Sequence, residues 1–279
     1  MTSRTRSTRS MWPAHLAVWL YAAVLCIPLY FVLVSSVKDD TAIFANGFSL
    51  PGSWHWDNFS KAWDQAQLGP AMLNSLFITL GAEVGGLALA IPAAYALARS
   101  GSRLAAWAEK AFSLGFLIPG LAALVPTVLL AIELQLFQTR LFLILLFTAN
   151  AQPLAVILLT QFMRGIPREL DEAAVVDGAS RLRVLFHIYL PLAMPGVATV
   201  FILNFLGIWN EYLFSATLLS SDVSVRTLQV ALPTLQSQTN PQYGVLLAGT
   251  LLCSVPMFAL FAGLQRRMMT ALTQGSLKA

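Results

Sequence analysis

Residues 141–147 read Leu-Phe-Leu-Ile-Leu-Leu-Phe, an apolar run without a single charge. The run lies in an apolar block from about 140 to 161, long enough for an α-helix to cross a hydrocarbon core roughly 30 Å thick. A membrane β-strand would instead show a short segment of alternating polarity. The stretch therefore predicts a transmembrane helix, because a helix satisfies its backbone polar groups within itself.

The rest of the chain repeats this pattern. Of its 279 residues, 57% are hydrophobic and only 11% are charged, which is far from the usage of soluble domains. Further apolar blocks lie at about 12–36, 70–98, 106–131, 192–218 and 243–265. We therefore predict an all-α polytopic membrane protein with about six transmembrane helices.

The basic residues predict how the chain is oriented in the membrane. Of the 17 Lys and Arg residues, only Lys38, Lys61, Arg140 and Arg226 fall on one side of the predicted spans. The richer side is expected to be the cytoplasm, which places both chain ends there in a protein of the plasma or inner membrane. The net charge of +4 follows from this bias, so membrane lipid rather than nucleic acid is the expected surrounding.

The predicted spans divide the chain into regions. The apolar stretch that begins at Trp12 is longer than a signal-peptide core, so an uncleaved first span is favoured. The regions are a cytoplasmic N-terminal segment (1–11), a first transmembrane helix with an external loop (12–69), a transmembrane core (70–266) that contains a cytoplasmic loop (162–190), and a cytoplasmic tail (267–279).

Two of the predicted spans contain unusual residues. Gly81 and Gly85 are spaced for close approach of two helices. Glu83 between them should face protein or water, because a carboxylate in lipid is costly, and an interhelix hydrogen bond is favoured over a proton or ion relay. Pro119 and Pro126 should kink the third span.

The loop between the fourth and fifth spans carries the most informative motif. Residues 165–180 read Gly-Ile-Pro-Arg-Glu-Leu-Asp-Glu-Ala-Ala-Val-Val-Asp-Gly-Ala-Ser. Pro167 suits the first position of a short helix, and Gly178 is placed to end it in a left-handed conformation. Ser180 can cap a second helix that runs to Pro191.

The first of these helices is expected to dock on another protein. It is acidic, and this disfavours contact with anionic lipid. Leu170, Ala173, Ala174 and Asp177 share one helical face, on which the two alanines leave room for a partner.

The loop resembles the EAA loop of the membrane subunits of ATP-binding-cassette importers. The resemblance rests on Glu172-Ala173-Ala174, then Gly178, then Ile188 and Leu190-Pro191. It implies the type I importer permease fold and a coupling helix that contacts the ATPase. The residues to which it assigns this contact are Glu172, Ala173, Ala174, Asp177 and Gly178.

Other segments resemble the second permease subunit of maltose and glycerol-phosphate importers. They are Asn74-Ser75, residues 93–99 (Ala-Ala-Tyr-Ala-Leu-Ala-Arg), Trp209-Asn210-Glu211 and the C-terminal tail. The resemblance implies a carbohydrate substrate, a second homologous permease, an ATPase dimer and an extracytoplasmic solute-binding protein. It also implies that the tail contacts the ATPase through Gln274, Gly275 and Lys278.

The chain itself is not expected to be an enzyme. Its sequence lacks the Gly-x-x-x-x-Gly-Lys-Ser/Thr loop that holds nucleotide phosphates, so ATP hydrolysis belongs to a separate subunit. Neither Cys26 and Cys253 nor the three histidines have metal-ligand spacing, so no metal or cofactor is expected.

Two questions stay open at the level of sequence. In the fifth span, polar and aromatic side chains can line a translocation path or hold the second permease; these are Asn204, Trp209, Asn210 and Glu211. The alternative function is an ion-coupled secondary transporter, for which Glu83 and Glu211 are the candidate coupling residues.

Overall fold

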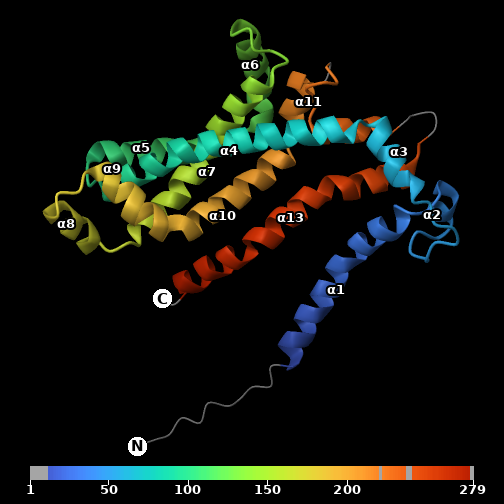
Figure 1. Cartoon of the computed structure of the whole chain (residues 1–279), viewed down its shortest axis with the longest axis horizontal. Coiled ribbons are helices and arrows are strands. Elements are labelled where there is room, and N and C mark those ends of the chain that lie inside the picture. Colours follow the sequence, from blue (N-terminus) through green and yellow to red (C-terminus); the bar gives the residue numbers. More distant parts are fainter. Residues whose placement is uncertain (1–11, 220–221, 237–240, 277–279) are drawn as a thin grey trace, which may run out of the picture. The chain divides into compact units, whose positions relative to one another are not determined.

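A computed structural model describes residues 12–219, 222–236 and 241–276, except for the side chains of residues 13, 14 and 264–276 (Figure 1). Helices form the architecture of this described part. The chain divides into two compact units, and each is described by itself. The first contains residues up to 66 together with 235–252, and the second contains 67–234 together with the residues from 253 onward.

The first unit consists of a long apolar helix followed by short helices. These are α1 (Trp12–Ser35), α2 (Asp40–Asn46) and α3 (Asp57–Gln65), joined by the beginning of α13 (Tyr243–Ser276). Asp39 caps α2, and hydrogen bonds from Thr41 and then Ala42 keep the pKa of this carboxyl below its ordinary value. The buried Lys38 stabilises the turn at the end of α2, because its ammonium donates to the carbonyls of Asn46 and Gly47.

The second unit contains the remaining helices. They are α4 (Leu68–Arg99), α5 (Arg103–Leu114), η1 (Gly115–Leu117), α6 (Gly120–Glu133), α7 (Arg140–Arg164), α8 (Glu169–Val176), α9 (Arg181–Val184), η2 (Leu185–Tyr189), α10 (Leu190–Trp209), α11 (Leu213–Leu219), α12 (Leu228–Ala231) and η3 (Leu232–Leu235).

The predicted membrane spans agree with most of these helices. Within the described residues, five helices are long and apolar enough to cross a membrane, and a bent pair makes a sixth. The bent pair is the predicted third span, whose two parts, Arg103–Leu117 and Gly120–Glu133, meet at 99°. The predicted bend at Pro119 is therefore confirmed, but it is a break between two helices, and α6 continues through Pro126. Pro119 explains the break, since a proline disfavours helical backbone in the residue before it, and Ile118 is extended.

The fifth span also differs from its prediction, at both ends. The helix capped by Ser180 does not stop at Pro191 but continues through the π-helical turn η2 into α10. Pro191 has no N–H to donate to the preceding turn, and the π-helical turn shifts the backbone hydrogen bonds there, so the helix can continue. The helix then ends at Trp209 instead of continuing to 218, because Glu211 starts a separate helix, α11.

The core of the second unit is built around α4, which lies against α7 and α10 (Figure 1). α4 and α7 are parallel, since Gly85 faces Thr148 near the middle of both helices while Arg99 reaches Ile166 at their ends. We call this contact the α4–α7 seam. A Cβ at Gly85 would lie only 2.8 Å from Thr148 Oγ1, so the predicted small-residue seam is confirmed.

Glu83 lies within this core. Its exposed fraction is 1%, which confirms that it faces protein rather than lipid. The predicted interhelix hydrogen bond is wrong, because neither carboxylate oxygen has a hydrogen-bond partner in the described part of the chain.

Candidate functional site

The loop between α7 and α9 folds as the short helix α8, closed by a glycine turn. Acidic side chains occupy its first turn, where they complement the helix dipole. Gly178 has φ +76°, which confirms the predicted left-handed conformation. The amide of Gly178 donates to Val175 O and that of Ala179 to Ala174 O, so the last carbonyls of α8 are satisfied. Pro167 lies before the helix, which begins at Glu169, and not at its first position.

The two faces of α8 have different environments. Glu169, Glu172, Ala173 and Val176 follow the i, i+3, i+4, i+7 spacing and are all exposed, Val176 by 87%. We call these four residues the exposed face of α8. The opposite side carries Ala174, which is only 8% exposed.

The predicted docking face is therefore wrong in one respect. It combined Leu170, Ala173, Ala174 and Asp177, but the structure turns Ala174 into the core of its own chain, against a cluster that includes Val184 and Leu185. Two neighbouring faces of the helix each contain an alanine, one Ala173 and the other Ala174. Spacing alone therefore does not say which face points inward.

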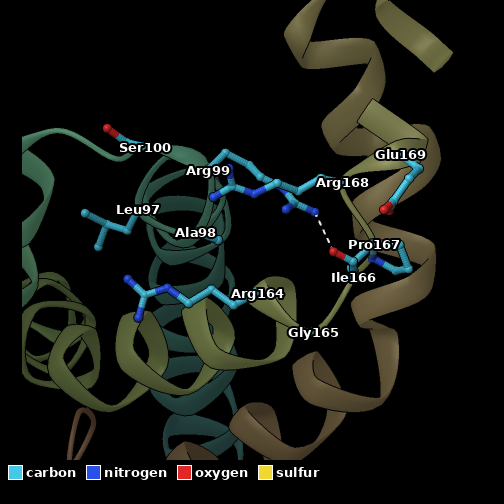
Figure 2. A pocket seen from close by; sticks show the side chains of 10 residues that line it. All are labelled: Leu97, Ala98, Arg99, Ser100, Arg164, Gly165, Ile166, Pro167, Arg168 and Glu169. Carbon is cyan, nitrogen blue, oxygen red and sulfur yellow. Dashed lines mark hydrogen bonds between the residues drawn. The ribbon is translucent and has the colours of Figure 1, made fainter. Parts of the chain in front are cut away.

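Arg99, the last residue of α4, reaches the connection between α7 and α8 (Figure 2). Its Nε is 2.9 Å from Asp171 Oδ2, and its terminal nitrogen donates to Ile166 O at 2.8 Å. Its guanidinium carbon lies 4.5 Å from the centre of the Tyr189 ring in η2. Arg99 was not among the predicted site residues, although it stands in the 93–99 motif.

A cavity of about 590 Å³ opens beside these contacts. Figure 2 shows its lining, which comes from the end of α4 and from the connection between α7 and α8. Arg164 at the edge of this cavity forms two hydrogen bonds of 2.9 and 2.6 Å with Glu109 and so joins α7 to α5. The end of the second unit that carries α8 is thus rich in arginine, and we call it the basic end.

The four predicted residues of the fifth span do not form one site. Asn204 and Trp209 are buried, and the Trp209 indole donates to Cys253 O at 3.3 Å. Asn210 is exposed. Glu211 accepts from the amides of Phe214 and Ser215, and so acts as the cap of α11.

Of the predicted ATPase contacts of the tail, Gln274 and Gly275 lie in the last turn of α13, where side chains are not described, and Lys278 lies outside the described residues.

The comparison with protein families gives one match. The model of the family described as "Binding-protein-dependent transport system inner membrane component" matches residues 86–270, which include α7, α8 and α10.

Curated relatives match nearly the whole chain. The chain is 34% identical over 269 residues to the diacetylchitobiose uptake system permease protein of Streptomyces coelicolor, covering 95% of this chain and 88% of that protein. It is 32% identical over 276 residues to the melibiose/raffinose/stachyose import permease protein of Bacillus subtilis, covering 99% of both.

A solved structure has the same fold. One chain of the crystal structure of a bacterial transporter that imports alginate superposes with a TM-score of 0.80 and 22% identity. The superposition covers 95% of this chain and 99% of that chain. The fold is therefore that of an importer permease.

Proposed function

This chain belongs to the binding-protein-dependent transport system inner membrane component family, and we propose that it is a permease subunit of an ATP-driven carbohydrate importer. Its apolar helices make it a multi-pass membrane protein. Membership of this family favours ATP-driven import over the ion-coupled alternative.

The proposed substrate class is an oligosaccharide or related sugar. It is supported by the names of relatives, which concern diacetylchitobiose, the group of melibiose, raffinose and stachyose, and the degradation products of starch. These relatives share 32–34% identity with the chain.

The observation that carries the proposed mechanism is the exposed face of α8. A short helix that shows Glu172, Ala173 and Val176 to solvent, and that ends in a left-handed glycine, has the form of a docking element. In the proposed function it seats in a cytoplasmic ATPase, with Ala173 allowing close approach and Glu172 forming a charge-assisted contact. Asp177 and Gly178 set the angle at which the helix leaves the turn.

The other partners follow from the same proposal. The basic end is assigned to the cytoplasm, where the ATPase dimer would bind, and both chain ends are assigned to that side. A second homologous permease completes the pathway, and a solute-binding protein delivers the sugar outside. Through Gln274, Gly275 and Lys278 the tail is proposed to reach the ATPase, as the resemblance of the tail implies.

The fifth span divides its roles. Asn204 and Trp209 are buried in this chain, so we assign them to packing of its own helices. Asn210 remains exposed and is the residue we assign to the second permease or the solute. Glu211 contributes indirectly, because it caps α11, the helix that follows Asn210.

The test is Glu172→Ala in the assembled complex. Loss of a charge-assisted contact worth about 1.5–3 kcal/mol should weaken association with the ATPase roughly 10- to 100-fold, and uptake should fall with it. The control is Glu133→Ala, since Glu133 is an exposed glutamate at the end of α6, away from α8. Unchanged ATPase association and sugar uptake in Glu172→Ala would overturn the proposed coupling helix.

A further inference from the structure

α8 is a short helix with little to hold it in place. It has eight residues, well below the length at which an isolated helix is stable in water. Within the described chain, Ala174 is its one buried side chain, whereas Val175 and Val176 are exposed by 64% and 87%. Packing alone therefore does not fix its orientation.

The Arg99 guanidinium supplies the missing attachment. It lies at the end of α4, where a cation also complements the helix dipole. From there it contacts three segments that follow much later in the chain, through Asp171, Ile166 and the ring of Tyr189. The planar fork of arginine suits such simultaneous contacts, which a lysine would not reproduce.

The contact is shielded from water. The side chains of Arg99 and Asp171 are 13% and 22% exposed, less than those of the neighbouring pair of Arg164 and Glu109, at 40% and 24%. Tyr189, which lies beneath the guanidinium, is fully buried and packs edge-on against Tyr95 of α4 at 4.9 Å. A shielded ion pair is less screened by salt than an exposed one.

α4 can transmit a movement from the Arg99 contact into the core of the second unit. It is 32 residues long, about 48 Å in an α-helix, and its middle forms the α4–α7 seam. Arg99 therefore joins the element exposed to a partner directly to a helix in the core.

Resting on the proposed role of α8, we propose that Arg99 is a positioning residue that ties α8 to the end of α4 through Asp171 and Ile166. Displacement of α8 by the ATPase is then passed to α4 and so to the transport pathway. When the tie is absent, α8 still docks through its exposed face, but its movement no longer moves α4.

The experiment compares Arg99→Gln, Asp171→Asn and the charge exchange Arg99→Asp with Asp171→Arg in the full complex with its ATPase. The control is Arg103→Gln, which removes an exposed arginine at the start of α5. The measured quantities are ATPase association and the number of ATP molecules hydrolysed per sugar imported. Asp171→Asn keeps the shape of the side chain, so it remains informative if Arg99→Gln does not assemble.

A second measurement reports the position of α8 directly. Spin labels at Val175→Cys and Leu104→Cys, both exposed, give the distance between α8 and α5 after Cys26→Ser removes the exposed native thiol. A control pair at Leu104→Cys and Leu182→Cys reports α9 and α5 instead.

We expect both single variants to keep their association with the ATPase. The number of ATP molecules hydrolysed per sugar imported should rise about fivefold or more, because fivefold is the lower limit of typical allosteric coupling. The Val175 distance should broaden while the Leu182 distance stays unchanged, and the charge exchange should restore part of both losses. Unchanged stoichiometry and an unchanged Val175 distance would overturn the proposal, as would equal broadening in Arg103→Gln.

The two proposals fail in different ways. If Glu172→Ala weakens ATPase association and the Arg99 and Asp171 variants behave as the parent protein, the coupling helix stands and the tie is overturned. If Glu172→Ala has no effect, the coupling helix fails, whereas broadening of the Val175 distance in Asp171→Asn would still establish the tie.

Discussion

The middle of α4 and its last residue, Arg99, differ in how firmly they hold their neighbours. In the α4–α7 seam, Gly85 of α4 lies against Thr148 of α7, and the side chains of Thr148 and Gln152 donate to α4 carbonyls. At the basic end, one ion pair joins α8 to α4, one hydrogen bond joins α4 to Ile166 just before α8, and a single alanine of α8 is buried.

This difference indicates separate tasks for the two regions. At Gly85 the seam has no room for a further methyl group, so it favours one arrangement of α4 and α7. The α8 attachment is polar and local, and local contacts of this kind open at lower free-energy cost than a packed core. A rigid helix with a lightly attached docking element suits a subunit that a separate motor must move.

The largest effect is expected at Glu83, which is buried on the same helix as the seam. Glu83→Arg would place a cation that does not lose its charge at a site with 1% exposure, and should destabilise the fold by at least about 3 kcal/mol. Glu83→Gln keeps the size of the side chain without a charge and should leave stability near that of the parent. Thermal unfolding of both purified variants checks this. Equal stability of the two would mean that the site is open to water.

A smaller loss is expected where the helices approach most closely. Gly85→Val would drive a side chain into Thr148 and should cost about 1–3 kcal/mol. Gly207→Val is the matched control, because Gly207 also lies within a transmembrane helix, but a Cβ added there would meet no described atom within 4 Å. The lower melting temperature should belong to Gly85→Val. Similar values for the two variants would argue against a tight seam.

The smallest effect on stability, and a marked one on coupling, is expected at Gly178. A Cβ there meets no described atom within 4 Å, so the cost of Gly178→Ala, about 1 kcal/mol, comes from the positive φ alone. Gly101→Ala is the control, since Gly101 has the same open surroundings without a positive φ. ATP-dependent uptake should fall in Gly178→Ala, and further in Gly178→Pro, which fixes φ near −65°.

Uptake by the two Gly178 variants equal to that of Gly101→Ala would show that the turn does not set the docking angle of α8.

Several parts of the molecule were determined by the sequence alone. The length of each apolar run predicts a membrane helix, because the bilayer thickness sets that length wherever the run stands in the chain. The conformation of Gly178 follows from the residues of its own turn. The cap at Ser180 is equally local, since its hydroxyl oxygen accepts from Arg183 N three residues on.

The tertiary structure decided what depends on distant neighbours. It turned Ala174 inward, toward a cluster that includes Val184 and Leu185, which the spacing of small residues had left undetermined. It also brought Arg99 to Asp171. No local pattern contains that pair, because its two residues belong to separate helices and meet only after α4, α7 and η2 have packed together.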